Sequence, residues 1–297
     1  AGEFAGKYIS AALLSADTLE GGGVTIKPNV KYKEVMKTLS TDAIVKDATC
    51  DFSDTSTLTL AEKILQPEEF QVNLELCKSD FASDWEAISM GYSAFDELPS
   101  NFADYLIGHV AAKVAQKTEQ TIWTGATANA GEFNGFGALL AADTDVVDVT
   151  GTSVTAANVI TEMGKVVDAV PTSIYGKDDL YIYVSSNVAR AYVRALGGFG
   201  ASGLGANGVR NEGTTWFNNQ DLAFDGVKIF VASGMANNTM VAAQKSNLFF
   251  GTGLMSDQNE VKLLDMADLD GSKNVRVVMR YTAGVQIGIG ADIVYYS

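Results

Sequence analysis

Alternation of apolar and polar residues over 70–76 limits, more than any other feature, what this chain can fold into. The apolar members are Phe70, Val72, Leu74 and Leu76, with a polar residue between each pair. This period of two predicts a strand with one buried face. Leu58 and Leu60, ahead of a turn at residues 67–69, predict its antiparallel partner. We therefore expect a long hairpin over about residues 54–77. Isolated two-stranded ribbons are marginal in water, so a neighbouring subunit is expected to bury it.

The rest of the chain mixes helix and strand signals. Apolar residues recur at spacings of four over 101–124, and Gly125 follows them, which predicts a long helix. Shorter helices are predicted over 155–170 and 187–196, and a buried strand over 180–184. A glycine-rich loop covers 197–215, and from Val227 onward the chain reads as strand and turn. The first 25 residues are rich in glycine and alanine and predict a flexible arm, whereas residues 24–54 are ambiguous. The predicted fold class is α+β.

Composition excludes several classes of protein. With 297 residues, 47% of them apolar, the chain is neither disordered nor fibrous. Its apolar runs are far shorter than the roughly 18 residues that span a bilayer, so no membrane contact is expected. The net charge of −15 argues against wrapping nucleic acid through phosphate neutralisation. Cys50 and Cys77 are too few for a disulfide framework. They predict a reducing compartment and two small core residues.

The negative charge is concentrated in residues 51–110. This segment holds twelve acidic residues against only Lys63 and Lys78, a net charge of −10. One interpretation is a solvated acidic face. The other is a surface that meets basic groups of another subunit, with Glu68 and Glu69 at the predicted hairpin turn as its acidic partners. The basic groups available for such contacts are Lys27, Lys31, Lys33, Lys37, Lys46, Arg190, Arg194, Arg210, Arg276 and Arg280.

Two glycine-containing motifs imitate ligand sites without their structural context. Residues 203–208 fit the dinucleotide pattern G-x-G-x-x-G, but here the predicted helix precedes the loop instead of following it. Residues 265–271 resemble a calcium loop, but the alignment places Met266 and Val277 at positions that require oxygen ligands. Asp270-Gly271 fits a hairpin turn between strands over 260–265 and 275–281 better.

The remaining candidates for chemistry are single residues. His109 is the only histidine, so no two-histidine metal site is available, and its place in the long predicted helix indicates a structural role. Asn237-Asn238-Thr239 matches a glycosylation sequon by chance. We expect no catalytic residue, no cofactor and no metal site. With 36 acidic residues, a pair of carboxylates acting as acid and base stays open as an alternative.

The order of these elements resembles that of the major capsid proteins of tailed bacteriophages, the Hong Kong 97-type fold. The resemblance is carried by residues 60–77, residues 98–125, and residues 247–254 with the strands that continue to Tyr296. It implies four parts, which are an N-terminal arm over 1–27, an extended loop and its base over 28–78, a peripheral domain over 79–171 and 255–297, and an axial domain over 172–254. The helix over 101–124 would be the spine of the peripheral domain, and the loop over 197–215 would lie near the capsomer axis.

The resemblance also implies a function. The chain would be a non-enzymatic major capsid protein that forms hexamers and pentamers of an icosahedral shell around packaged double-stranded DNA. Its partners would be other copies of itself, portal and scaffolding proteins, decoration proteins in some relatives, and DNA contacted non-specifically. It would belong to the virion and be assembled in the bacterial host cytoplasm. Some relatives cross-link a lysine to an asparagine, but no residue here matches that chemistry. The alternatives are an encapsulin-like compartment that encloses cargo enzymes, and a soluble carboxylate-dependent hydrolase.

Overall fold

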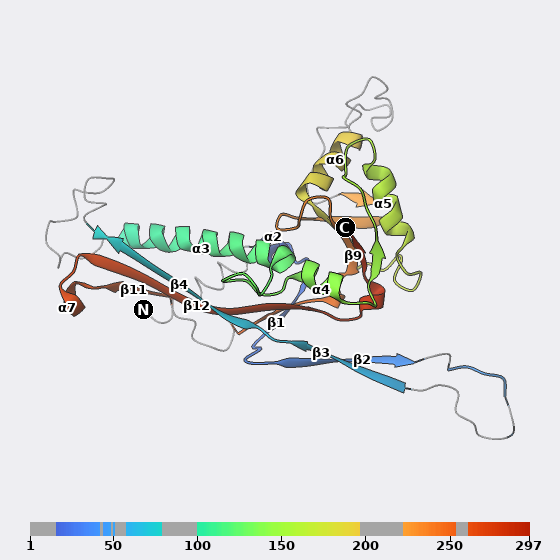
Figure 1. The fold of residues 1–297 in the computed structure, drawn as a ribbon, viewed down its shortest axis with the longest axis horizontal. Coiled ribbons are helices and arrows are strands. Elements are labelled where there is room, and N and C mark those ends of the chain that lie inside the picture. The colour runs from blue at the N-terminus through green and yellow to red at the C-terminus, as the bar shows by residue number, and fades with distance from the viewer. Residues whose placement is uncertain are drawn as a thin grey trace.

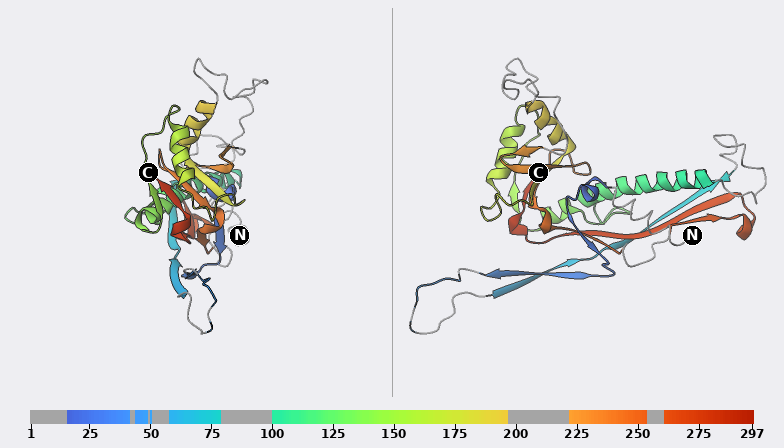
Figure 2. Two further views of the ribbon diagram at one scale, coloured as in Figure 1. Left: turned by 90° about the vertical axis from the view of Figure 1, so that its right-hand side faces the viewer. Right: turned by 180° about the vertical axis from the view of Figure 1, so that it is seen from behind.

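A computed structural model describes residues 16–41, 44–48, 50, 58–78, 100–196, 222–253 and 261–297. These residues form three parts, namely a long unit along helix α3, an upper unit that contains α5 and α6, and a two-stranded hairpin below them (Figure 1). The hairpin projects beneath the upper unit (Figure 2). Within the described residues, no helix combines the length and apolar character needed to cross a membrane.

The long unit packs one helix against a sheet. Helix α3 (Ser100–Thr124) lies along β4 (Glu68–Cys77), β11 (Val261–Asp265) and β12 (Asn274–Ile287). The central strand is β12, which pairs antiparallel with β4 and β11 and, further along, with β10 (Leu248–Thr252). Strand β1 (Thr25–Pro28) pairs in parallel with β10. Alternate residues of β12 are buried beneath α3, as a strand with one covered face requires.

Helix α3 confirms the predicted long helix. Val110, Val114, Ile122 and Trp123 are buried in the core that it shares with the sheet. The helix ends at Thr124, where a short loop returns the chain to α4 (Phe136–Ala142). Gly125 is required at this turn, because a Cβ atom there would lie 2.4 Å from the carbonyl oxygen of Phe133. The backbone approach that glycine permits therefore fixes where the helix stops.

The upper unit is a six-stranded sheet with helices α5 (Val159–Asp168) and α6 (Ser186–Leu196) on one face. Its strand order is β5 (Val147–Val149), β13 (Val294–Tyr296), β9 (Met240–Gln244), β6 (Leu180–Ser185), β8 (Val227–Ala232) and β7 (Ala223–Phe224). The side chains of Ile182 and Val184 face the two helices, whereas Tyr183 between them packs into the core of the long unit. The six-stranded sheet thus contributes side chains to the core of the upper unit and to the core of the long unit.

The strands of this sheet come from both sides of the predicted domain boundaries at residues 171/172 and 254/255. Strand β5 and helix α5 precede residue 172, and β13 follows residue 255, yet all three belong to the upper unit. In the opposite sense, β10 lies before residue 255 but pairs with β1 and β12 of the long unit. The two predicted boundaries therefore do not coincide with the limits of the two sheets, and the division of the chain into domains stays a prediction.

The predicted hairpin over 54–77 is wrong. Strand β3 (Leu58–Leu65) pairs with β2 (Glu34–Thr41), a strand that the sequence left ambiguous, while β4 pairs with β12. The chain changes partner at Pro67, which has no N–H to donate and which lies against Gly284. Glu68 and Glu69 consequently lie in β4 and not at a hairpin turn. On the apolar face of β4, Phe70 and Val72 pack against the core of the same subunit, whereas Leu74 is 42% exposed.

The segment over 16–27 is packed, which contradicts the prediction of a free arm for these residues. Ala16, Leu19 and Val24 are buried in the core of the long unit, beside the short helix α2 (Asp17–Glu20). Residues 1–15 lie outside the described part of the chain. The prediction of an arm is wrong for residues 16–27 because their glycine and alanine residues allow close packing. Gly21 and Gly23, for example, contact the ring of Phe230.

Other local predictions had mixed outcomes. Helix α5 begins at Val159, four residues later than predicted, because the Asn158 side chain closes a turn by accepting the backbone N–H of Thr155 at 2.7 Å. Strand β6 and helix α6 are confirmed. Strands β11 and β12 form the predicted pair, joined by the short helix α7 (Ala267–Asp270) and by Gly271 at a φ of 71°. Cys50 is exposed, so it is not the core residue that was predicted.

Candidate assembly interface

The β2/β3 hairpin carries an apolar face that the subunit does not cover. Its register places Val35 opposite Ile64, Lys37 opposite Glu62, Leu39 opposite Leu60, and Thr41 opposite Leu58. Directly opposed residues share one side of an antiparallel pair, so a single face is formed by the side chains of Val35, Lys37, Leu39, Leu58, Leu60, Glu62 and Ile64. The exposed fractions of its apolar members are 47% for Val35, 59% for Leu39, 60% for Leu58, 63% for Leu60 and 47% for Ile64.

Such a face is unusual on a soluble monomer. Scattered exposed apolar residues are common, but a contiguous group on a projecting element marks an interaction surface. A two-stranded ribbon of this kind is also marginally stable unless something packs against it. The hairpin therefore has the chemistry of an interface that is completed by another molecule.

The base of the hairpin is anchored to its own subunit. Leu65 is fully buried and lies against Gly251 of β10. The Lys63 ammonium group forms an ion pair with Asp143 at 2.6 Å, and the Gln286 side chain donates a hydrogen bond to the Ile64 carbonyl at 2.8 Å. The hydrogen bond from Lys63 lowers the pKa of Asp143. The base of the hairpin is thus held by its own subunit, whereas the apolar side chains beyond the base are exposed.

A cavity of about 680 Å³ beside α3 is the place where paired carboxylates could act as an acid and a base. Asp17 and Glu119 both line it, and burial raises the pKa of Glu119. The Glu119 carboxylate already accepts hydrogen bonds from the Thr18 N–H at 2.8 Å and the Thr18 hydroxyl at 2.7 Å. The Thr18 hydroxyl in turn accepts from the Trp123 indole at 2.8 Å. This carboxylate joins α2 to α3, which is a structural role.

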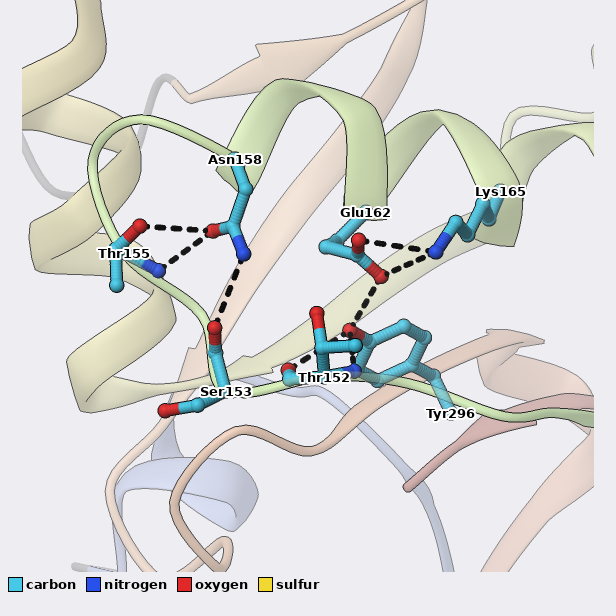
Figure 3. A network of polar contacts seen from close by, with 7 residues as sticks. All are labelled: Thr152, Ser153, Thr155, Asn158, Glu162, Lys165 and Tyr296. Carbon is cyan, nitrogen blue, oxygen red and sulfur yellow. Dashed lines mark hydrogen bonds and ion pairs between the residues drawn. The ribbon is translucent and has the colours of Figure 1, made fainter.

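In the upper unit, a second buried carboxylate, that of Glu162, links helix α5 to strand β13 (Figure 3). The Tyr296 hydroxyl donates to Glu162 at 2.7 Å and accepts from the Thr152 N–H at 2.9 Å. Lys165 pairs with Glu162 at 2.9 Å. The hydrogen bonds from Lys165 and Tyr296 lower the pKa of Glu162, so it stays ionised at neutral pH. The network fastens β13 to α5.

The other sequence candidates are not gathered at one place. His109 is exposed on α3. Asp265 is paired with Lys78, while Asp268 and Asp270 lie in α7. Among the described residues, no cluster of three or more His, Cys, Asp or Glu side chains could hold a metal ion. Residues 203–208 lie outside the described part. Sequence reasoning missed β2, although Val35 and Leu39 flank Lys37 at the spacing of one strand face.

The C-terminal end of α3 should respond to acid through Glu132. Hydrogen bonds from Lys117 and Asn129 lower the pKa of Glu132 from 4.5 to about 2. A depressed pKa stabilises the fold above the ordinary value, and this contribution is lost as the pH falls from 4.5 toward 2. We expect Glu132→Gln to lower the free energy of unfolding at pH 6 and to lower it less at about pH 3. Urea unfolding at both pH values tests this, and a deficit independent of pH would contradict it.

Solved structures of phage particles share this fold. The capsid of an empty GTA particle matches at a TM-score of 0.61 and 12% identity, over 95% of this chain and 89% of that chain. The capsid of Myoviridae phage XM1 matches at a TM-score of 0.58 and 11% identity, over 94% and 91%. The procapsid of satellite phage P4, which includes the Sid protein, matches at 0.54 and 10%, over 98% of both chains.

These similarities extend over the chain and not over one unit only. No protein-family profile and no curated protein sequence matches it. At identities of 10–12% the likeness shows the fold and not the function. The predicted α+β fold of the Hong Kong 97 type is confirmed: the chain has the fold of phage capsid proteins.

Proposed function

We propose that this chain is a major capsid protein, which assembles into the hexamers and pentamers of an icosahedral shell around double-stranded DNA. The observation that carries the proposal is the anchored hairpin with an uncovered apolar face. A shell subunit needs a surface that is stable only when another copy covers it, and this face meets that need. The capsid fold supports the same conclusion.

The parts of the chain take their roles from this proposal. The long unit with α3 is assigned as the peripheral domain, the upper unit as the axial domain, and the β2/β3 hairpin as the extended loop. We further propose that the chain is not an enzyme, and that it belongs to the virion after assembly in the host cytoplasm. Its proposed partners include portal and scaffolding proteins. The P4 procapsid to which this chain is similar includes an accessory protein.

The direct test is electron microscopy of the purified protein, together with sedimentation velocity. We expect closed shells of uniform diameter, and double-stranded DNA inside particles recovered from infected cells. A discrete monomer or small oligomer at all concentrations would refute the proposal. Cargo protein in place of DNA would favour the encapsulin-like compartment. The hydrolase alternative is disfavoured because hydrogen bonds from Thr18 hold Glu119, the buried carboxylate of the cavity beside α3.

A further inference from the structure

The turn between β1 and β2 presents an aromatic ring between two ammonium groups. Lys31, Tyr32 and Lys33 are all exposed, and the exposed fraction of Tyr32 is 71%. The Lys33 ammonium group lies over the Tyr32 ring, 5.3 Å from its centroid. Residues 27–34, which we call the basic turn, contain three lysines and one glutamate, a net charge of +2. The whole chain has a net charge of −15, so this turn is a local exception.

The basic turn is held in shape by its own subunit. Val30 is buried, and its N–H donates a hydrogen bond to the Thr252 carbonyl at 3.2 Å. Lys27 and Glu34 form an ion pair at 3.2 Å, which joins the two ends of the turn. A surface that is already ordered loses little conformational entropy when it binds, so the exposed side chains of this turn are suited to recognition.

The opposite charge pattern occurs in the segment that joins β11 to β12. Asp268 and Asp270 of α7 are exposed on either side of Leu269, which is 71% exposed. Residues 265–273, which we call the acidic tip, contain three aspartates and one lysine, a net charge of −2. Two buried side chains anchor the tip, those of Met266 and Ala267. An apolar side chain thus stands between two carboxylates, just as the ring of the basic turn stands between two ammonium groups.

One subunit cannot bring its own basic turn and acidic tip together. In Figure 1, α7 lies at the end of the long unit that is remote from the upper unit, whereas β1 leads to the base of the hairpin. A contact between the two surfaces must therefore join different copies of the chain. Such a contact is heterologous, because the turn of one copy meets the tip of the next, and contacts of this kind form rings when their rotation closes.

We propose that the basic turn of one copy docks on the acidic tip of a second copy. The two exposed lysines of the turn then face the two exposed aspartates of the tip, and Tyr32 lies against Leu269 of the partner subunit. Exposed ion pairs are individually weak, but complementary charges fix the orientation of the contact. The inference rests on the proposed function, since it requires that copies of the chain assemble.

Two charge reversals test the docking. The turn reversal combines Lys31→Glu with Lys33→Glu, and the tip reversal combines Asp268→Lys with Asp270→Lys. We expect each reversal alone to raise the subunit concentration needed for assembly about tenfold, because like charges then face each other. All four changes together should restore assembly to within about threefold of the wild type, because opposite charges face each other again.

Two further variants separate the contact from local structure and from net charge. Asp270 accepts a hydrogen bond from the Ser272 N–H at 2.9 Å, which the tip reversal removes. Asp268→Lys alone keeps this bond, and we expect it to improve the assembly of the turn reversal. Lys177→Glu with Lys228→Glu changes the net charge as the turn reversal does, at exposed positions of the upper unit, and should assemble like the wild type.

Light scattering and electron microscopy provide the readout, with circular dichroism to confirm that each variant is folded. Normal assembly of the turn reversal would overturn the inference, and a loss of packaged DNA in its place would assign the turn to DNA. Equal loss of assembly in the turn reversal and in the net-charge control would overturn it as well. So would a four-residue variant that assembles no better than the turn reversal. Absence of particles from the wild type would instead refute the proposed function.

Discussion

Replacing Leu60 by aspartate should abolish particle formation and leave the subunit folded. Leu60 is 63% exposed, so a carboxylate at this position stays hydrated in the unassembled subunit. On docking, the same carboxylate would be buried without a partner, at a cost on the order of several kcal/mol per contact. Every subunit repeats the contact, so the effect on assembly is large. Circular dichroism and thermal melting report on folding, and sedimentation velocity reports on assembly.

The adjacent residue provides a matched control. Ala61 is exposed on the opposite face of β3, where it stands across from Thr38. Ala61→Asp introduces the same charged residue into the same strand, and it should assemble nearly as the wild type does. Equal loss of particles in both variants would mean that the hairpin is merely intolerant of aspartate. Normal assembly of Leu60→Asp would show that the apolar face is not part of the interface.

The second large expected effect is a loss of folding stability when Tyr296 is replaced. Its side chain is fully buried in the upper unit, and a Cβ atom on Gly151 would lie 2.2 Å from its ring. Truncating a buried aromatic residue costs about 3–5 kcal/mol, a large share of the roughly 5–15 kcal/mol by which a typical protein is stable. We expect Tyr296→Ala to lose about this amount in urea unfolding, measured in the Leu60→Asp background so that assembly does not interfere.

Two further variants separate packing from hydrogen bonding at Tyr296. Tyr296→Phe keeps the ring but removes the donor to Glu162, and should cost about 1–3 kcal/mol. Tyr175→Ala removes an aromatic ring of the same unit that is 50% exposed, and should cost about 1 kcal/mol or less. If Tyr296→Ala were no more destabilising than Tyr175→Ala, the buried ring of Tyr296 would not be what holds β13 in the upper unit.

The sequence predicted elements better than it predicted their neighbours. The period of two over 70–76 correctly indicated a strand with one covered face, and the apolar spacing over 101–124 correctly indicated α3. Neither pattern specifies a partner, because periodicity records which side of an element is covered and not what covers it. The partner of β4 is β12, about two hundred residues away in the chain.

The candidate interface shows the same limit. An uncovered hairpin face was expected on residues 70–76, but Phe70 and Val72 of that stretch pack against the core of their own subunit. The uncovered face is formed by β2 and β3, and β2 was missed because Lys37 interrupts its apolar alternation. The packed segment over 16–27 was missed because its anchor, the hydrogen bonds from Thr18 to Glu119, joins residues 101 positions apart.

Strand β12 gives the long unit a preferred direction of mechanical strength. It is 14 residues long, roughly 46 Å at about 3.3 Å per residue, and it pairs with β4, β11 and β10 in turn. Hydrogen bonds of antiparallel strands run across the strand axis, so a pull along β12 loads many of them at once in shear. A pull perpendicular to the strands would instead break these hydrogen bonds one after another. In the proposed shell, internal pressure would be resisted best if β12 lay along the direction of tension.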